Sequence, residues 1–222
     1  PYSKQASVAV VKSEEGRYFP GCRVENISYP LSISAVQSAL FCCISERDIP
    51  HTVWTSHPDD TTIPFWENEY DITVKELNHN DVTEFEFPDL LLNANINIEE
   101  TLTVLLDDAQ VEQSNFPVSA LVETENGFFS GVNIECSSWD MGLCAERVAV
   151  AKALAFGAEQ LHTLHIHTRD GEFSSPCGAC RQVIIEHLPD RKVHLHHADH
   201  SKSIHFSTDL LPHSFQSSSL ST

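Results

Sequence analysis

Basic residues are scarce in this chain of 222 residues. It contains 13 Lys and Arg against 32 Asp and Glu, which gives a formal net charge of −19 with His counted as neutral. A protein that binds nucleic acid usually meets each contacted phosphate with a Lys or Arg. The deficit therefore argues against a polynucleotide substrate and favours a small ligand.

Long apolar runs are missing as well. No stretch reaches the roughly 18 apolar residues of a membrane span, and the first residues do not resemble a signal peptide. The seven cysteines are an odd number, which fits a reducing compartment better than a disulfide framework. We therefore expect a cytoplasmic protein without a membrane partner, and its 41% of hydrophobic residues is enough for a packed core.

Three of the cysteines have the spacing of a metal site. Cys144 begins the segment Cys-Ala-Glu-Arg, while Cys177 and Cys180 belong to Pro-Cys-Gly-Ala-Cys-Arg-Gln. Zn²⁺ prefers four tetrahedral ligands, and a catalytic site takes three from the protein and leaves the fourth position for water. If the proline turn opens a helix, the sulfurs of Cys177 and Cys180 face one ion from its first turn. We expect these three thiolates to bind one Zn²⁺ per chain.

Glu146 distinguishes a catalytic zinc site from a structural one. A structural site is closed by a fourth Cys or His and does not need a carboxylate two residues after its first ligand. Zinc-dependent deaminases, in contrast, use a glutamate that does not bind the metal. This glutamate moves protons between the attacking water, the ring nitrogen and the departing amine. The pattern predicts that Glu146 is the catalytic residue.

The two cysteine motifs together resemble those of the cytidine deaminase family in its three-cysteine form. The resemblance implies a zinc-dependent hydrolysis of cytidine or 2′-deoxycytidine to the uridine nucleoside and ammonia, as in pyrimidine salvage. The expected partner is thus a free nucleoside. Three thiolates around Zn²⁺ leave a net negative charge, which Arg147 and Arg181 are positioned in the sequence to offset.

The same resemblance assigns five positions to the substrate. Asn133 and Glu135 lie in Gly-Val-Asn-Ile-Glu, which is similar to the family segment that holds the ribose hydroxyls, and strand alternation places both on one face. Phe116 resembles an aromatic residue near the nucleoside, although an ordinary core Phe explains it almost as well. Ala145, beside the first zinc cysteine, is expected to contact the substrate. Phe215 resembles an aromatic residue that approaches a neighbouring subunit's substrate.

An internal repeat at an offset of 110 residues indicates a duplication. Residues 21–40 align without a gap with residues 131–150, but Ser34 replaces the first zinc cysteine and Val36 replaces the glutamate. We interpret residues 1–79 as a degenerate, non-catalytic half that resembles the broken half of two-half cytidine deaminases. Residues 80–96 are predicted to be a connector, and residues 97–222 the catalytic domain.

Hydrophobic periodicity predicts alternating strands and helices. This alternation implies an α/β fold, an α/β/α sandwich with a mixed central sheet of about five strands in the complete domain. Asn97, followed by Glu100, predicts a capped helix that continues to residue 110. The other expected strands are 7–11, 118–122, 163–168, 193–197 and 203–206, and the other expected helices are 33–44, 144–156 and 177–188.

Histidines between residues 162 and 200 raise the question of a second metal site. Seven of the 13 histidines of the chain lie on or beside the two predicted strands of this region, namely His162, His165, His167, His194, His196, His197 and His200. Alternation along the predicted strands divides them between the two sheet faces, and no pair lies four residues apart on a predicted helix beside an acid. We therefore do not expect a second metal.

Two other functions remain open from the sequence. The chain could deaminate another cytosine-containing small molecule such as blasticidin S, or it could be a non-catalytic zinc-binding regulator. Asn133 and Glu135 favour a ribose, and the intact Glu146 opposes the regulator. Because simple family members are tetramers of single domains, a chain with one active and one degenerate half is expected to form a homodimer that mimics such a tetramer.

Overall fold

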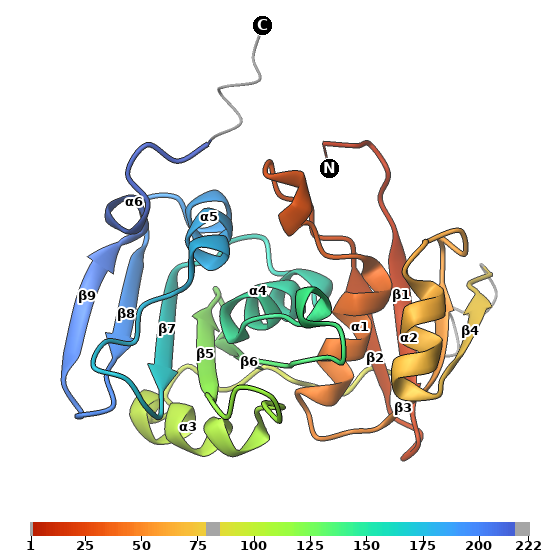
Figure 1. The fold of residues 1–222 in the computed structure, drawn as a ribbon, viewed down its shortest axis with the longest axis horizontal. Helices are drawn as coiled ribbons and strands as arrows, with labels where there is room; N and C mark the ends of the chain where they lie inside the picture. Colours follow the sequence, from red (N-terminus) through yellow and green to blue (C-terminus); the bar gives the residue numbers. More distant parts are fainter. Residues whose placement is uncertain (1, 79–84, 216–222) are drawn as a thin grey trace, which may run out of the picture.

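Two mixed β-sheets, joined through their helices, form the molecule (Figure 1). The computed structural model describes residues 2–78, here called the N-terminal half, and residues 85–215, here called the C-terminal half. Helix α1 of the N-terminal half packs against helix α4 of the C-terminal half, between the two sheets. The start of the predicted connector at residues 80–84 lies outside the described residues.

The N-terminal half contains a four-stranded sheet in the order β2-β1-β3-β4. Strand β1 pairs antiparallel with β2 and β3, and β3 pairs in parallel with β4. All ten residues of α1 are buried, because this helix lies between its own sheet and the C-terminal half. The elements are β1 (Val8–Ser13), β2 (Tyr18–Cys22), the 3-10 turn η1 (Tyr29–Leu31), α1 (Ala35–Ile44), β3 (Pro50–Thr55), α2 (Ile63–Tyr70) and β4 (Thr73–Glu76).

The C-terminal half contains the predicted five-stranded mixed sheet, in the order β6-β5-β7-β8-β9. Helix α3 packs on one face of this sheet, and α4 packs on the other face beside α5, so the α/β/α sandwich is confirmed. In the part of the chain that the structure describes, no helix has the length and apolar character needed to cross a membrane. The strands are β5 (Val118–Glu123), β6 (Phe128–Val132), β7 (Thr163–Thr168), β8 (Lys192–His196) and β9 (Lys202–Phe206). The helices and 3-10 turns are α3 (Ile98–Leu105), η3 (Leu106–Asp108), η4 (Trp139–Met141), α4 (Ala145–Ala155), α5 (Gly178–His187) and α6 (Ser207–Leu210).

Equivalent backbone contacts occur in both halves, as a duplication would require. Gly21 in β2 lies so close to the α1 backbone at Ala35 that a Cβ atom would collide with it. Gly131 in β6 lies in the same way against the α4 backbone at Ala145. In each half, glycine allows a strand and the following helix to approach closely. The alignment of these four residues has the offset of 110 that the sequence predicts.

Hydrogen bonds between the halves also occur in equivalent pairs. The Glu186 carboxylate in α5 accepts the backbone N–H of Ile27, with distances of 3.0 and 3.1 Å to its two oxygens. The Glu69 carboxylate in α2 accepts the backbone N–H of Ser137 at 2.7 Å. Ile27 and Ser137 occupy matching positions in the repeat, so the two halves meet around an approximate two-fold axis.

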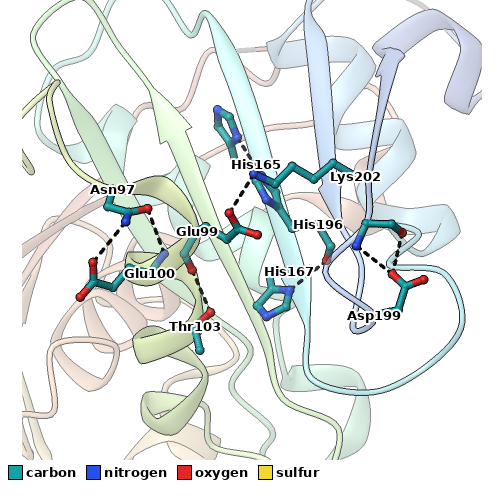
Figure 2. A network of polar contacts seen from close by, with 10 residues as sticks. Asn97, Glu99, Glu100, Thr103, His165, His167, His196, Asp199 and Lys202 are labelled. Carbon is teal, nitrogen blue, oxygen red and sulfur yellow. Dashed lines mark hydrogen bonds and ion pairs between the residues drawn. The ribbon is translucent and has the colours of Figure 1, made fainter.

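The helix predicted over residues 97–110 is capped as expected but is shorter. Asn97 Oδ1 accepts the backbone N–H of Glu100 at 3.3 Å, while the Glu100 carboxylate accepts from the Asn97 side-chain amide rather than from its backbone (Figure 2). The α-helix ends at Leu105. The chain turns away because the backbone of Gln110 pairs with Asn133 and Glu135.

Four histidines share one sheet face, so their predicted division between faces is only partly right. His165 lies directly opposite His194 in the β7–β8 pair, and His167 lies opposite His196. The rings of His165 and His194 stack with centroids 4.5 Å apart. His165 Nδ1 lies 3.1 Å from His196 Nε2 (Figure 2). Burial lowers the pKa of His165 to about 3 and that of His196 to about 4. Both are therefore neutral in the folded protein at neutral pH.

These histidines predict a loss of stability in mild acid. The unfolded chain binds protons at His165 and His196 below about pH 6.5, whereas the folded chain does so only near their lowered pKa values. The free energy of unfolding should therefore fall as the pH decreases from about 6.5. Replacing His165 with Gln should weaken this pH dependence by roughly 2 kcal/mol between pH 7.5 and 5, measured by urea unfolding.

His57→Gln is the matched control for this prediction. His57 is exposed in the folded protein, so unfolding changes its surroundings little. The control should retain the pH dependence of the wild type. If the free energy of unfolding changed equally with pH in wild type and His165→Gln, the role given to burial of His165 would be contradicted.

Candidate active site

Two helix N-termini bring together the three cysteines that the sequence selects. Cys144 is the N-cap of α4 and Cys177 is the N-cap of α5, with Cys180 in the first turn of α5. Their sulfur atoms all lie within 4.8 Å of one another, and Cys144 Sγ is 3.7 Å from Cys177 Sγ. Within residues 2–78 and 85–215, no other group of three or more Cys, His, Asp or Glu side chains is close enough to share an ion.

The three thiols of the sulfur cluster share their protons. Hydrogen bonds from the thiols of Cys144 and Cys180, together with the backbone N–H of Cys180, lower the pKa of Cys177. The same sharing of thiol protons raises the pKa of Cys144 and of Cys180. A divalent cation that binds all three sulfurs must displace the remaining protons. The donor set therefore fits a metal that prefers thiolates.

Glu146 is buried beside the sulfur cluster. It lies in the first turn of α4 and is 4% exposed. Burial raises the pKa of its carboxyl group to about 7. Its Oε2 atom is buried and has no hydrogen-bond partner among the described residues. A buried carboxylate oxygen without a partner is costly, which indicates that a group from outside the chain completes the site.

A cavity of about 330 Å³ adjoins this carboxylate. Its volume is within the range of pockets that hold small ligands. Cys144, Cys177 and Glu146 line this cavity. Three of the predicted substrate residues line it as well: Phe116, Asn133 and Glu135.

Asn133 and Glu135 reach the cavity from an irregular segment rather than from a strand. Strand β6 ends at Val132, so the predicted strand position of these two residues is wrong. The Asn133 side chain accepts the backbone N–H of Val118 at 2.8 Å and donates to the Phe116 carbonyl at 2.9 Å. It thus fixes the segment that presents the Phe116 ring, which is 40% exposed.

The Glu135 carboxylate is held by backbone donors. Its Oε2 atom accepts the N–H groups of Gln113 at 2.9 Å and Ser114 at 3.1 Å. Two such bonds fix the side chain in one orientation while it lines the cavity. The side chains of Asn133 and Glu135 therefore both line the cavity, although strand β6 ends before them.

The two predicted charge-tuning arginines bond to carbonyl and hydroxyl oxygens near the cluster. A terminal nitrogen of Arg147 donates to the Leu31 carbonyl of the N-terminal half at 2.9 Å. Arg181 Nε donates to the Pro176 carbonyl at 2.9 Å, and its terminal nitrogen donates to Ser175 Oγ at 2.7 Å. Arg181 therefore fixes the turn that leads into Cys177.

Ala145 and Phe215 do not line the cavity. Ala145 is fully buried as the first residue of α4. Phe215 is 49% exposed, and its carbonyl accepts from the Gln182 side chain at 2.9 Å. Its predicted contact needs a second subunit and remains a prediction.

Sequence reasoning missed several cavity residues because they come from turns and strand ends. Trp139 belongs to η4, and Ile166 and Thr168 lie at the carboxyl end of β7. Trp139 is 65% exposed, which is unusual for such a large apolar side chain. The position of Trp139 in the sequence, between Asn133 and Cys144, could have indicated that it lines the cavity.

Comparisons with known proteins agree with this geometry. Residues 97–196 match the family model for the cytidine and deoxycytidylate deaminase zinc-binding region. A cytidine deaminase from Mycoplasma genitalium is 35% identical over 95 residues, which cover 41% of this chain and 73% of that protein. A cytidine deaminase from Sporosarcina psychrophila is 43% identical over 81 residues, which cover 36% of this chain and 60% of that protein. A blasticidin-S deaminase from Bacillus cereus is 30% identical over 100 residues, which cover 41% of this chain and 68% of that protein.

Among solved structures, a cytidine deaminase from Burkholderia pseudomallei is similar to part of the fold. Its TM-score is 0.50 with 33% sequence identity, and the match covers 52% of this chain and 94% of that chain. This match supports the fold of about half of the chain.

Proposed function

This chain belongs to the cytidine deaminase family, and on that premise we propose that it converts cytidine or 2′-deoxycytidine to the corresponding uridine nucleoside and ammonia. One observation carries the proposal. The buried Glu146 carboxylate has an oxygen without a partner among the described residues, and it lines the same cavity as a three-sulfur cluster. Pyrimidine salvage in the cytoplasm is the setting that fits this reaction.

Cys144, Cys177 and Cys180 would hold one Zn²⁺ per chain. Three thiolates are ligands that zinc prefers, and they leave a fourth position open. When bound, Zn²⁺ would supply Lewis-acid activation of a water molecule. The guanidinium groups of Arg147 and Arg181 would offset part of the negative charge of the thiolates.

Glu146 would carry the protons of the reaction. It takes a proton from the attacking water and delivers it to N3 of cytosine, and it later moves a proton to the departing amine. A C4–O bond forms and the C4–N bond breaks, so one water and one cytidine give one uridine and one ammonia. The buried Oε2 atom, which has no hydrogen-bond partner in the part of the chain that the structure describes, is available for this transfer.

The other cavity residues would orient the nucleoside. The fixed carboxylate of Glu135 can accept a ribose hydroxyl, and Asn133 contributes beside it. The Phe116 ring would lie near the nucleoside, with Ala145 at the start of the active-site helix. Phe215 would approach the substrate of a second subunit.

The two halves would have different tasks. Residues 97–222 carry the proposed chemistry, residues 80–96 connect, and residues 1–79 form a degenerate half that retains no metal-binding set among its described residues. Two chains would then form a homodimer that mimics a tetramer of single domains. The paired contacts of Glu69 and Glu186 between the halves support this proposal.

A direct assay tests the proposed function. We expect the absorbance of cytidine to fall when zinc-loaded protein is added, and a panel with deoxycytidine, CMP and blasticidin S should identify the substrate class. Turnover of blasticidin S alone would favour the second candidate, which the match to the Bacillus cereus protein supports. Binding without turnover of any of these compounds would instead indicate a regulator.

A further inference from the structure

Two hydrogen bonds between the halves occupy equivalent positions around the approximate two-fold axis. Gln37 Nε2 in α1 donates to the Met141 carbonyl at 2.8 Å, and Arg147 in α4 donates to the Leu31 carbonyl at 2.9 Å. Gln37 and Arg147 are each the third residue of a helix, and Met141 and Leu31 each end a 3-10 turn. Each half thus donates one such hydrogen bond to the other.

The turn that Gln37 contacts forms part of the cavity wall. Turn η4 contains Trp139, which lines the cavity, and the lining continues through Gly142 and Leu143 to Cys144. Within the turn, the Met141 N–H donates to the Ser138 carbonyl at 3.0 Å. The turn has only three residues, so a side-chain bond at Met141 restricts the position of the whole wall.

Gln37 is well placed to act as this anchor because its own position is fixed. It is 9% exposed, and its backbone N–H donates to the Ser34 hydroxyl, the N-cap of α1, at 3.2 Å. Ser34 replaces the first zinc cysteine of the repeat, so the helix start is preserved while the ligand is lost. A buried amide that donates to a carbonyl strongly restrains both groups.

We propose that Gln37 is a positioning residue for the active site in the other half of the chain. It acts through the Met141 carbonyl, holds η4 in place and so sets how tightly the cavity wall at Trp139 closes on the nucleoside. It does not touch the substrate. This inference rests on the proposed function for its kinetic effect, but the anchoring of η4 stands apart from it.

Kinetics of Gln37 variants test the proposal. Gln37→Leu removes the donor at similar volume, and we expect KM for cytidine to rise about 2- to 10-fold, from the net worth of one hydrogen bond. kcat should stay within about 2-fold, and zinc content should not change. Gln37→Arg restores a donor of the kind that Arg147 supplies at the equivalent position, and KM should return toward the wild-type value.

Ser38→Ala is the matched control. Ser38 is the next residue of α1, is 3% exposed, and its hydroxyl has no hydrogen-bond partner among the described residues. If any substitution in α1 raised KM, Ser38→Ala would raise it too. If only the loss of the Gln37 hydrogen bond raises KM, Ser38→Ala would not. We expect its KM to equal that of the wild type.

Hydrogen exchange separates the anchor from the enzymatic function. Backbone amides of residues 137–143 should exchange faster in Gln37→Leu than in wild type or Ser38→Ala, with no substrate present. If the wild type does not deaminate cytidine, the proposed function fails while this measurement still tests the anchor. Unchanged exchange and unchanged KM in a folded Gln37→Leu protein would overturn the proposal. If that variant does not fold, Gln37→Asn, which keeps the amide but shortens its reach, provides the same test.

Discussion

Glu146→Gln is expected to retain its metal and to lose turnover of cytidine by about 10³-fold or more, in line with the usual contribution of a general acid and base. Gln has nearly the same shape, so the cavity and the first turn of α4 should be preserved. It cannot accept a proton from water and return it to the ring and the amine. Zinc analysis and the rate of absorbance loss measure the two effects separately.

The stability of the same variant provides a second measurement. Glu146 is 4% exposed and its Oε2 atom is buried without a partner among the described residues, so the carboxylate is costly in the folded protein. A neutral amide should keep or raise the melting temperature. Glu125→Gln, at an exposed turn position, should keep full activity. A Glu146→Gln protein that still formed uridine at the normal rate would exclude the proposed role.

Cys180→Ser is expected to remove both the metal and the activity. Cys180 is fully buried, and its sulfur lies within 4.8 Å of the sulfurs of Cys144 and Cys177. A hydroxyl is a much weaker zinc ligand than a thiolate, so two cysteines remain where three are needed. The zinc content should fall from one per chain toward zero, and turnover should fall to the background rate.

Cys43→Ser controls for the burial of a hydroxyl. Cys43 is also fully buried, but it lies in α1 and outside the sulfur cluster. Both variants bury a hydroxyl in place of a thiol, and Cys180→Ser should in addition lose the stabilisation that bound zinc supplies. Loss of zinc should occur in Cys180→Ser alone. Full zinc content in Cys180→Ser would show that this sulfur is not a ligand.

Sequence patterns predicted the C-terminal half well because its elements have strong local signals. The strand over residues 163–168 has the bounds of β7, and the helix expected at residues 177–188 differs from α5 by one residue at each end. Asn97 caps α3 as predicted. The motifs also place Cys144 and Cys177 at helix starts, which is local information.

Contacts between distant residues could not be predicted in this way. Helix α2 was missed because Glu67, Asn68 and Glu69 give it a polar sequence, and its packing depends on the buried Trp66. The end of β6 at Val132 follows from pairing with a distant segment at Gln110. The contact of Arg147 with Leu31 crosses 116 positions of the chain, and no periodicity reveals it.

The reciprocal bonds of Gln37 and Arg147 have a consequence for how the two halves stay together. Between separate identical subunits, one substitution would change both sides of the axis at once. A single chain allows Gln at one position and Arg at its counterpart, while the carbonyl acceptors remain the same. The covalent link also gives each half a high effective concentration for the other. Association of the halves is therefore insensitive to dilution. The neutral amide of Gln37, a weaker donor than the charged guanidinium of Arg147 at the equivalent position, is then sufficient.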